Sequence, residues 1–400
     1  MNQTKPTMFL RTFIRSLAAI AASLVATAGL TASVTWHDVQ FGGFASQGYL
    51  ANTGINDYLG RTSDGTFDFR EYAANASWSK GKFRVGAQAF GQKLGQYGDD
   101  KIKLDWAVVD YQAAQWFGVR AGRVKMPRGL YNEALDLDSV RPFVLLPQSV
   151  YDSRLRDFNA AFNGAMIYGN VGLKRFGSFD YRAFYGAIPI SLSSGAADYF
   201  NTGLNATTLS MGMDHVTGGT FFWNTPISGL RAGYSYSEFG QLAIKRRAFF
   251  GPTATTYVKQ ADAYKRQLIS VEYTRGDWIF ATEVGREDAR FVLTPFATAT
   301  IRPAKIKYAY FSASRRINSW LELGSYASWS QERQATNALL RQADYAVSAK
   351  FDLSEHVIFK LEDHQMYGAG KIFDTPTHPQ PLALRSESWN MIAAKITYSF

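Results

Sequence analysis

The sequence predicts an all-β fold, a transmembrane antiparallel β-barrel of about sixteen strands. Three observations carry this prediction: an export signal at the start of the chain, amphipathic segments that recur along its whole length, and connections that alternate between short and long. Successive side chains of a strand point to opposite faces, so each such segment presents one apolar and one polar face.

The export signal occupies the first residues of the chain. "MNQTKPTMFLRTFIRS" carries three basic residues and no acidic residue, and the short apolar run "LAAIAASLV" follows it. "ATA" at 26–28 has the small-x-small pattern of a cleavage site, and Ala32 is a second candidate. The apolar run is too short and interrupted for an anchoring helix, the alternative interpretation. We therefore predict a signal peptide over 1–28 and a single barrel domain over 29–400.

The composition narrows the possible environments of the chain. Cysteine is absent, which excludes disulfides, thiolate metal sites and a cysteine nucleophile. Beyond the signal, no uninterrupted apolar run exceeds four residues, whereas a membrane-spanning helix needs about 20. The 29 Phe, 22 Tyr and 9 Trp residues require a large core or an apolar phase outside the protein. Tryptophans near expected strand ends, such as Trp278, Trp320, Trp329 and Trp389, are candidates for aromatic girdles at the membrane interfaces.

Amphipathic strand candidates follow one another along the chain. "LELGSYASW" places Leu321, Leu323 and Trp329 on one face and Glu322 and Ser328 on the other. The expected strands lie near 39–50, 67–79, 82–92, 102–114, 117–125, 157–168, 177–187, 215–224, 228–238, 266–275, 277–286, 305–315, 319–330, 342–352, 355–367 and 388–400.

The connections between these strands distinguish a membrane barrel from a soluble sandwich. Tight turns such as "SKGK", "RGD" and "DLSEH" alternate with long stretches near 51–66, 126–156, 188–214, 239–265, 287–304, 331–341 and 368–387. Outer-membrane barrels place short turns on one side of the membrane and long loops on the other. A sheet in lipid must also close, because an open edge would leave backbone groups without partners.

The chain ends in "MIAAKITYSF", in which Ile392, Ala394, Ile396, Tyr398 and Phe400 share one face. We expect this last strand to pair with the first strand and close the barrel. An alternating C-terminal strand with a final Phe resembles the signal by which the barrel-assembly machinery recognises outer-membrane barrels of Gram-negative bacteria.

The segment "GRVKMPRGL" and the long stretch after it resemble the strand-to-third-loop junction of Gram-negative porins. The signal, strand count, loop rhythm and final Phe are similar to those of the sixteen-stranded general and substrate-selective porins, with some resemblance to the phosphate-selective group. The loop has no multi-lysine run, so phosphate itself is not specified. In that family the third loop folds into the barrel and narrows the pore, so the resemblance implies an inward-folded third loop over residues near 126–156 here.

The resemblance implies a set of constriction residues on the junction and the loop. Val124 would face lipid, and its neighbours on either side would face the lumen. The implied constriction residues are Arg123, Lys125, Arg128, Glu133, Asp136, Asp138, Arg141, Arg154 and Arg156. Arginine matches carboxylate and phosphate because its donors form a planar fork. These charges could instead pair with one another and pin the loop, and the two roles can coexist.

Other polar residues are expected on the inner faces of the strands. They are Arg84, Arg182, Glu283, Glu322, Lys360, Glu362 and His364. A water-filled lumen needs a polar lining, and solvation alone explains most of them.

These features imply a channel in the bacterial outer membrane for passive diffusion of small hydrophilic solutes, with a weak preference for anions. The basic excess supports that preference: the chain after residue 28 has 40 basic and 33 acidic residues. Expected partners are outer-membrane lipid and lipopolysaccharide, small hydrophilic or anionic solutes, and the barrel-assembly machinery. Export argues against nucleic acid, and both a homotrimer and a monomer stay open.

Two other classes of function compete with a channel: an outer-membrane barrel enzyme of the lipid-hydrolase type, and a plugged structural or adhesive barrel. The five histidines form no H-E-x-x-H motif, and no G-x-S-x-G motif occurs. Glu362 and His364 share a strand face in "EDH", but a metal or acid–base site needs further partners. We therefore expect no enzymatic activity, no metal and no cofactor.

Overall fold

A computed structural model describes residues 34–36, 38–201, 206–250, 253–294, 302–332, 337–375 and 378–400. The predicted signal peptide lies outside these residues. The strands are β1 (Val34–Trp36), β2 (Val39–Asn52), β3 (Phe69–Lys80), β4 (Phe83–Leu94), β5 (Lys103–Ala114), β6 (Phe117–Lys125), β7 (Ala161–Gly172), β8 (Ser178–Ala187), β9 (Ala206–Gly212), β10 (His215–Asn224), β11 (Leu230–Phe250), β12 (Thr253–Arg275), β13 (Trp278–Thr294), β14 (Arg302–Arg316), β15 (Leu321–Glu332), β16 (Arg341–Asp352), β17 (Val357–Gly368) and β18 (Ser388–Ser399).

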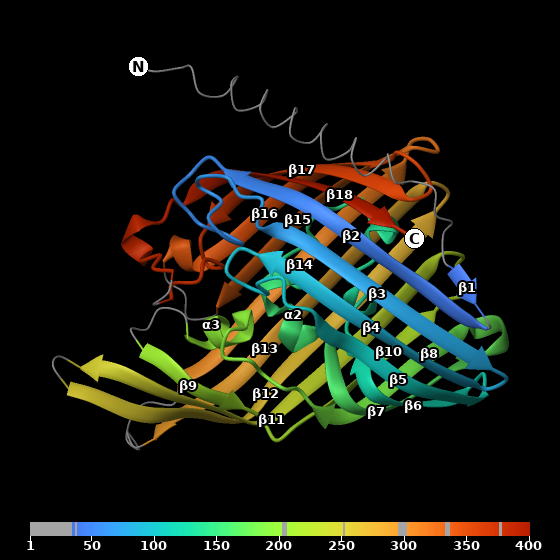
Figure 1. The fold of residues 1–400 in the computed structure, drawn as a ribbon, viewed down its shortest axis with the longest axis horizontal. Helices are drawn as coiled ribbons and strands as arrows, with labels where there is room; N and C mark the ends of the chain where they lie inside the picture. Colours follow the sequence, from blue (N-terminus) through green and yellow to red (C-terminus); the bar gives the residue numbers. More distant parts are fainter. Residues whose placement is uncertain are drawn as a thin grey trace.

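Sixteen of these strands form one closed antiparallel barrel (Figure 1). Each wall strand pairs with the next along the chain, except that β8 pairs with β10. The remaining two strands are additions: β1 pairs with the start of β2, and β9 pairs with the outer half of β11. The predicted all-β antiparallel barrel and its number of strands are confirmed.

The seam of the barrel joins the two ends of the wall. β18 pairs with β2 from Met391 opposite Asn52 to Ser399 opposite Phe44. Beyond the strand, the backbones of Phe400 and Gly43 exchange two hydrogen bonds of 3.0 Å each. The prediction that the terminal strand closes the barrel is therefore confirmed.

Exposure alternates along the strands as the sequence predicts. On β15, Leu323 and Trp329 are 44% and 37% exposed, whereas Glu322 and Ser328 are buried. The exposed face carries apolar residues around the wall, including Ile269, Val284, Phe311, Tyr345, Val347 and Leu361. We call this the outer face and the opposite, largely polar face the inner face.

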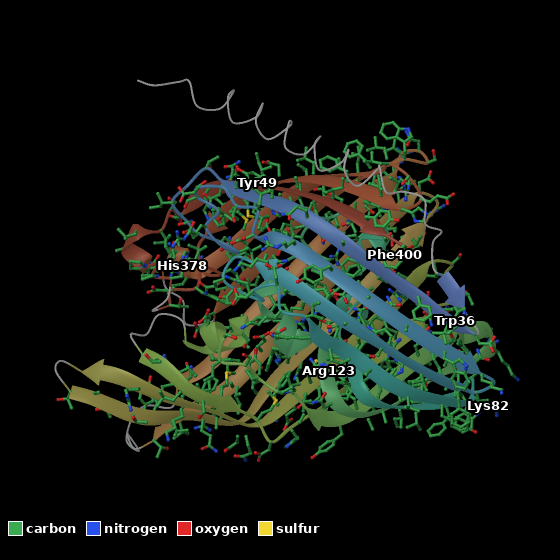
Figure 2. The ribbon with its side chains drawn as sticks, in the orientation of Figure 1. Trp36, Tyr49, Lys82, Arg123, His378 and Phe400 are labelled. Carbon is green, nitrogen blue, oxygen red and sulfur yellow. The ribbon has the colours of Figure 1, made fainter. Side chains whose placement is uncertain are left out.

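The two ends of the barrel differ, as the connection lengths predict. Lys82, in the tight turn between β3 and β4, lies at one end, and His378, in the long β17–β18 connection, lies at the other (Figure 2). Among the tryptophans expected in the girdles, Trp278, Trp320 and Trp329 are exposed. Trp389 is buried instead, because its indole nitrogen donates to the Gly368 carbonyl and its ring packs against Tyr58.

Three strands are longer than the sequence predicted. β11, β12 and β13 contain 21, 23 and 17 residues, and β11, β12 and β9 project beyond the neighbouring wall in Figure 1. The ladder between β11 and β12 continues through most of the stretch 239–265, which we expected to be a loop. The expectation was wrong because it required every strand to have an apolar outer face. A hairpin that extends beyond the membrane keeps its ladder of backbone hydrogen bonds without an apolar outer face.

The helices of the described residues are short. They are the 3-10 helices η1 (Asn132–Ala134), η2 (Asp138–Val140), η3 (Ser153–Leu155), η4 (Lys174–Phe176), η5 (Ala338–Leu340) and η6 (Leu382–Leu384), and the α-helices α2 (Arg156–Asn159) and α3 (Gly195–Asn201). η4 lies in the turn between β7 and β8. No helix in the described part of the chain is long and apolar enough to cross a membrane.

We predict that deletion of Phe400 lowers the amount of folded barrel in the outer membrane, because it removes both backbone bonds to Gly43 at the seam. Heat-modifiable mobility in electrophoresis measures the folded fraction. The matched control is Phe400→Ala, which keeps the backbone bonds and removes only the ring. Undiminished folded protein after the deletion would contradict a role of this residue in closure.

Candidate functional site

Residues 126–160, between β6 and β7, contact strands on the far side of the barrel. We call them the crossing segment. Glu362 of β17 accepts hydrogen bonds from the backbone N–H groups of Val144 (2.9 Å) and Leu145 (3.2 Å). Further bonds come from inner-face side chains of β16, β17 and β18: Lys350 to Ser139 O (2.6 Å), Ser348 to Pro142 O (2.6 Å), Lys360 to Phe143 O (3.0 Å) and Thr397 to Asp138 (2.6 Å). The segment is thus fastened across the barrel at several points.

Apolar contacts hold the same segment. Phe143 packs edge-on against Tyr326 of β15, with ring centroids 5.1 Å apart, and also packs with Ala346. The run "FVLL", with Pro142 and Pro147 at its ends, is buried throughout. These apolar contacts and the hydrogen bonds described above hold the segment in one position.

The first charge cluster joins the segment to β5 and β6. Arg156 donates to Asp105 (2.8 Å) and to Asp136 (2.7 Å), and Lys125 donates to the other oxygen of Asp136 (2.8 Å). Gln88 donates to both carboxylates, at 3.0 and 3.2 Å. Burial alone would raise the pKa of Asp136, but Arg156 and Lys125 hold it below its usual range. Two bases and two acids make the cluster formally neutral.

The second cluster surrounds Asp138. Its carboxylate lies 3.1 Å from Lys360, 2.9 Å from Lys395 and 3.8 Å from Arg141. Lys395 also pairs with Glu71 at 2.6 Å. Burial opposes ionisation of Asp138, but the three bases hold its pKa well below its usual range. Three bases face two acids here, so the cluster has one formal positive charge in excess.

Arg141 is the least satisfied base of this cluster. It is 8% exposed, yet its Nε and Nη1 atoms have no hydrogen-bond partner within the protein. Its ion pair with Asp138 is also longer than those of the two lysines.

The third cluster pairs Asp152 with Arg154 through two bonds of 2.9 and 2.8 Å. Arg154 also lies over the ring of Phe373 at 3.7 Å, and Lys371 is 3.6 Å from Asp152. Burial would raise the pKa of Asp152, but Arg154 and Lys371 hold it below its usual range.

Two predicted residues hold the ends of the crossing segment. Arg128 donates to Val150 O (2.8 Å) and to Tyr308 (3.3 Å) of β14. Glu283 of β13 accepts from the backbone N–H of Leu130 (3.0 Å) and from the Tyr310 hydroxyl (3.0 Å), and it also bonds Tyr151. These bonds give both residues an anchoring role.

The "EDH" pair has a third partner that the sequence did not indicate. His364 lies 2.8 Å from Glu362 and 2.9 Å from Asp344 of β16, and Tyr326 donates to Asp344 at 3.0 Å. All four residues are buried. Glu362 also accepts two amides of the crossing segment, so the cluster supports the anchor described above. Among the residues that the structure describes, no group of three or more His, Asp or Glu side chains is arranged so that it could hold a metal ion.

The remaining predicted inner-face residues lie apart from the three clusters. Arg182 pairs with Glu133 at 3.4 Å, and both side chains are about one third exposed. Glu322 accepts from Ser314 (3.1 Å) and lies 3.7 Å from Lys350. Arg84 lines a cavity described below.

Arg123 is not brought together with the other residues. It pairs in the ladder with Ala107 and Asn163, and its guanidinium donates to Asp105 O (2.9 Å) and Asn163 (3.4 Å). This register places it on the face of Ala165 and Ile167, which is exposed.

The expectation that Val124 faces lipid is wrong: it is fully buried in an apolar cluster with Phe162 and Phe184. The expected alternation, with Lys125 and Arg123 on the lumen side and Val124 on the lipid side, does not hold because Lys125 is the last residue of its strand. Its ammonium group reaches Asp136 instead of following the face of Arg123.

Three cavities lie around the crossing segment. One of about 540 Å³ is lined by Arg84, Asp110, Arg120, Lys125, Asp138 and the terminal Phe400, among others. One of about 40 Å³ is lined by Glu71, Asp136, Arg141, Asp152, Arg156 and Lys395, among others, and Asp136 borders both. A third, of about 390 Å³, includes Arg154 and His378 in its lining. The smallest cavity therefore has the densest lining of charges.

The sequence did not single out Glu71, Asp105, Asp344, Lys350 or Lys395. For Lys395 a signal existed, since the terminal strand places it on the polar face with Thr397 and Ser399. For the others, only their partners in the folded structure distinguish them from ordinary lining residues.

We predict that Asp138→Asn destabilises the barrel by about 3–5 kcal/mol, because it leaves three bases around a neutral group. The thermal midpoint of heat modifiability measures the effect. The matched control is Asp157→Asn in the same segment, which removes an exposed pair with Lys103 that contributes at most about 1 kcal/mol. Equal shifts in the two variants would contradict the assignment.

The pH dependence follows from the depressed pKa of Asp138. Its stabilisation is complete above the unfolded pKa of about 3.9 and is lost as the pH falls through the folded pKa. The difference between wild type and Asp138→Asn should be constant above about pH 5 and shrink below about pH 4. A difference that already shrinks between pH 7 and pH 5 would show that another group controls it.

Comparisons with known proteins indicate the fold. No family model and no curated protein matches the chain. Among solved structures, the anion-selective porin from Comamonas acidovorans is similar with a TM-score of 0.54, 14% identity, and coverage of 90% of this chain and 99% of that one. OmpF from Salmonella typhi, in complex with daunomycin, is similar with a TM-score of 0.55 and 11% identity, and the match covers 92% of this chain and 100% of that one. OmpT, an outer-membrane protein of Vibrio cholerae, is similar with a TM-score of 0.57 and 9% identity, and the match covers 92% of this chain and 100% of that one. At these identities the likeness concerns the fold alone: the chain has the closed sixteen-stranded barrel of outer-membrane porins.

Proposed function

We propose that the chain is an outer-membrane porin, a water-filled channel for passive diffusion of small hydrophilic solutes with a weak preference for anions. The observation that carries the proposal is the crossing segment, which is fastened to inner-face residues of β13, β14 and β16–β18 and bordered by two wide cavities and one narrow one. In this proposal the segment folds into the lumen and forms the constriction.

The balance of charge supports a weak preference rather than a tight selectivity. The cluster of Lys125 and Arg156 is formally neutral, and the cluster around Asp138 carries one excess positive charge. In a narrow channel of low dielectric constant, such an excess favours anions, and the carboxylates beside it orient dipolar solutes. Most constriction charges also pair with one another, so they hold the segment as well as line the passage.

The two alternative functions have less support. An enzyme would need free acid–base groups, but the His364 cluster is buried and engaged with the crossing segment. A plugged barrel would show no conductance, which the experiment below measures. Contacts with lipopolysaccharide and with the barrel-assembly machinery remain predictions of this proposal, which is compatible with both a homotrimer and a monomer.

Conductance of purified protein in a planar bilayer tests the proposal. We expect discrete conductance steps, and a reversal potential across a KCl gradient that indicates slight anion preference. Absence of steps from folded protein would favour the plugged barrel.

Lys125 and Arg123 offer a matched pair of variants. Lys125→Gln removes a charge that lines the 540 Å³ cavity, and the reversal potential should shift toward cations, most clearly at low salt, where screening is weakest. Arg123→Gln removes the same charge from the exposed side of β6 and should leave the reversal potential nearly unchanged. Equal shifts, or a shift in Arg123→Gln alone, would contradict the proposed constriction.

A further inference from the structure

We infer that Arg141 forms a binding site for one small monovalent anion, chloride or a short carboxylate, in the 40 Å³ cavity. This inference rests on the proposed channel function and adds a discrete site to its general charge preference. The three observations that carry it are the unpartnered donors of Arg141, the charge excess around Asp138 and the size of the cavity.

The unpartnered donors distinguish Arg141 from the bases beside it. Arg156 donates to two carboxylates, and Lys395 pairs with Glu71 and Asp138. Arg141 has only the 3.8 Å pair with Asp138, and its Nε and Nη1 have no acceptor although the side chain is more than nine-tenths buried. Buried donors without partners are costly, and guanidinium donors favour an anionic acceptor.

The cluster around Arg141 carries one formal positive charge in excess of neutrality. Lys360, Lys395 and Arg141 face only Asp138 and Glu71. One monovalent anion would balance this cluster, whereas a doubly charged anion would exceed it. The carboxylates of Glu71, Asp136 and Asp152 in the same cavity lining also disfavour a second negative charge.

The cavity limits the size of the ligand. A volume of about 40 Å³ exceeds the roughly 10–15 Å³ that one water molecule needs, so the cavity accommodates a few heavy atoms. Chloride, formate and acetate are of this size. Larger anions would have to move the crossing segment, which its bonds to Glu362 and Lys360 resist.

A binding site within a channel makes the ionic current level off as the concentration of the bound ion rises. We expect the single-channel conductance of the wild type in potassium chloride and in potassium acetate to level off as the salt concentration rises. Arg141→Gln should raise the half-saturating concentration about tenfold or more, the effect of losing one hydrogen bond to a charged group. Arg141→Lys, which keeps the charge but shortens the donor set, should fall between the two.

The matched control is Arg182→Gln, which removes an equal charge from a pair that is about one third exposed and lies outside the 40 Å³ cavity. It should retain saturation at the wild-type concentration. Heat modifiability of each variant shows whether the barrel is folded.

Failure of this inference differs from failure of the proposed function. Wild-type conductance that rises linearly with salt, or saturation unchanged in folded Arg141→Gln, would overturn the anion site while the channel stands. No conductance from the folded wild type would overturn the channel itself. Should Arg141→Gln not fold, bromide anomalous diffraction from wild-type crystals gives an independent test: bromide beside Arg141 supports the site, and its absence there overturns it.

Discussion

The rest of the structure depends on one constraint: in lipid, every backbone N–H and C=O group needs a partner within the protein. An open sheet of this size would leave two unpaired edges in hydrocarbon. The pairing of β18 with β2 removes both, and the exchange of bonds between Phe400 and Gly43 extends the seam to the end of the strand. Closure then fixes which face of each strand meets lipid and which faces inward.

Closure of the barrel also buries charged side chains on the inner faces of the strands, and the crossing segment supplies partners for them. The inner faces carry Lys350, Lys360, Lys395, Glu283 and Glu362, and all five are buried. A buried charge without a partner costs several kcal/mol, so each needs an opposite charge or a hydrogen-bond donor. The crossing segment supplies them through Asp138, backbone carbonyls and backbone amides. The same bonds position the charges that we propose to line the passage.

The sequence predicted most of the fold. Periodicity located all sixteen wall strands, because a strand between lipid and water must alternate. It underestimated β11–β13, since a hairpin beyond the membrane obeys no such rule. Within the candidate site, the sequence placed Glu362 and His364 on the same strand face, and both are buried on β17. It misjudged Val124, because a strand end releases its last side chain from the alternation.

The sequence by itself determined the all-β class, the number of wall strands, the alternation of short and long connections, and the residues from which a constriction could be built. These properties are local, since each follows from spacing along one strand or one loop. Only the tertiary structure decided the partners: Asp138 with Lys360 and Lys395, Arg156 with Asp105, His364 with Asp344. These contacts join residues far apart in the chain, and their geometry follows from closure and from the path of the crossing segment. For the same reason the unpartnered donors of Arg141 could not be read from its neighbours in sequence.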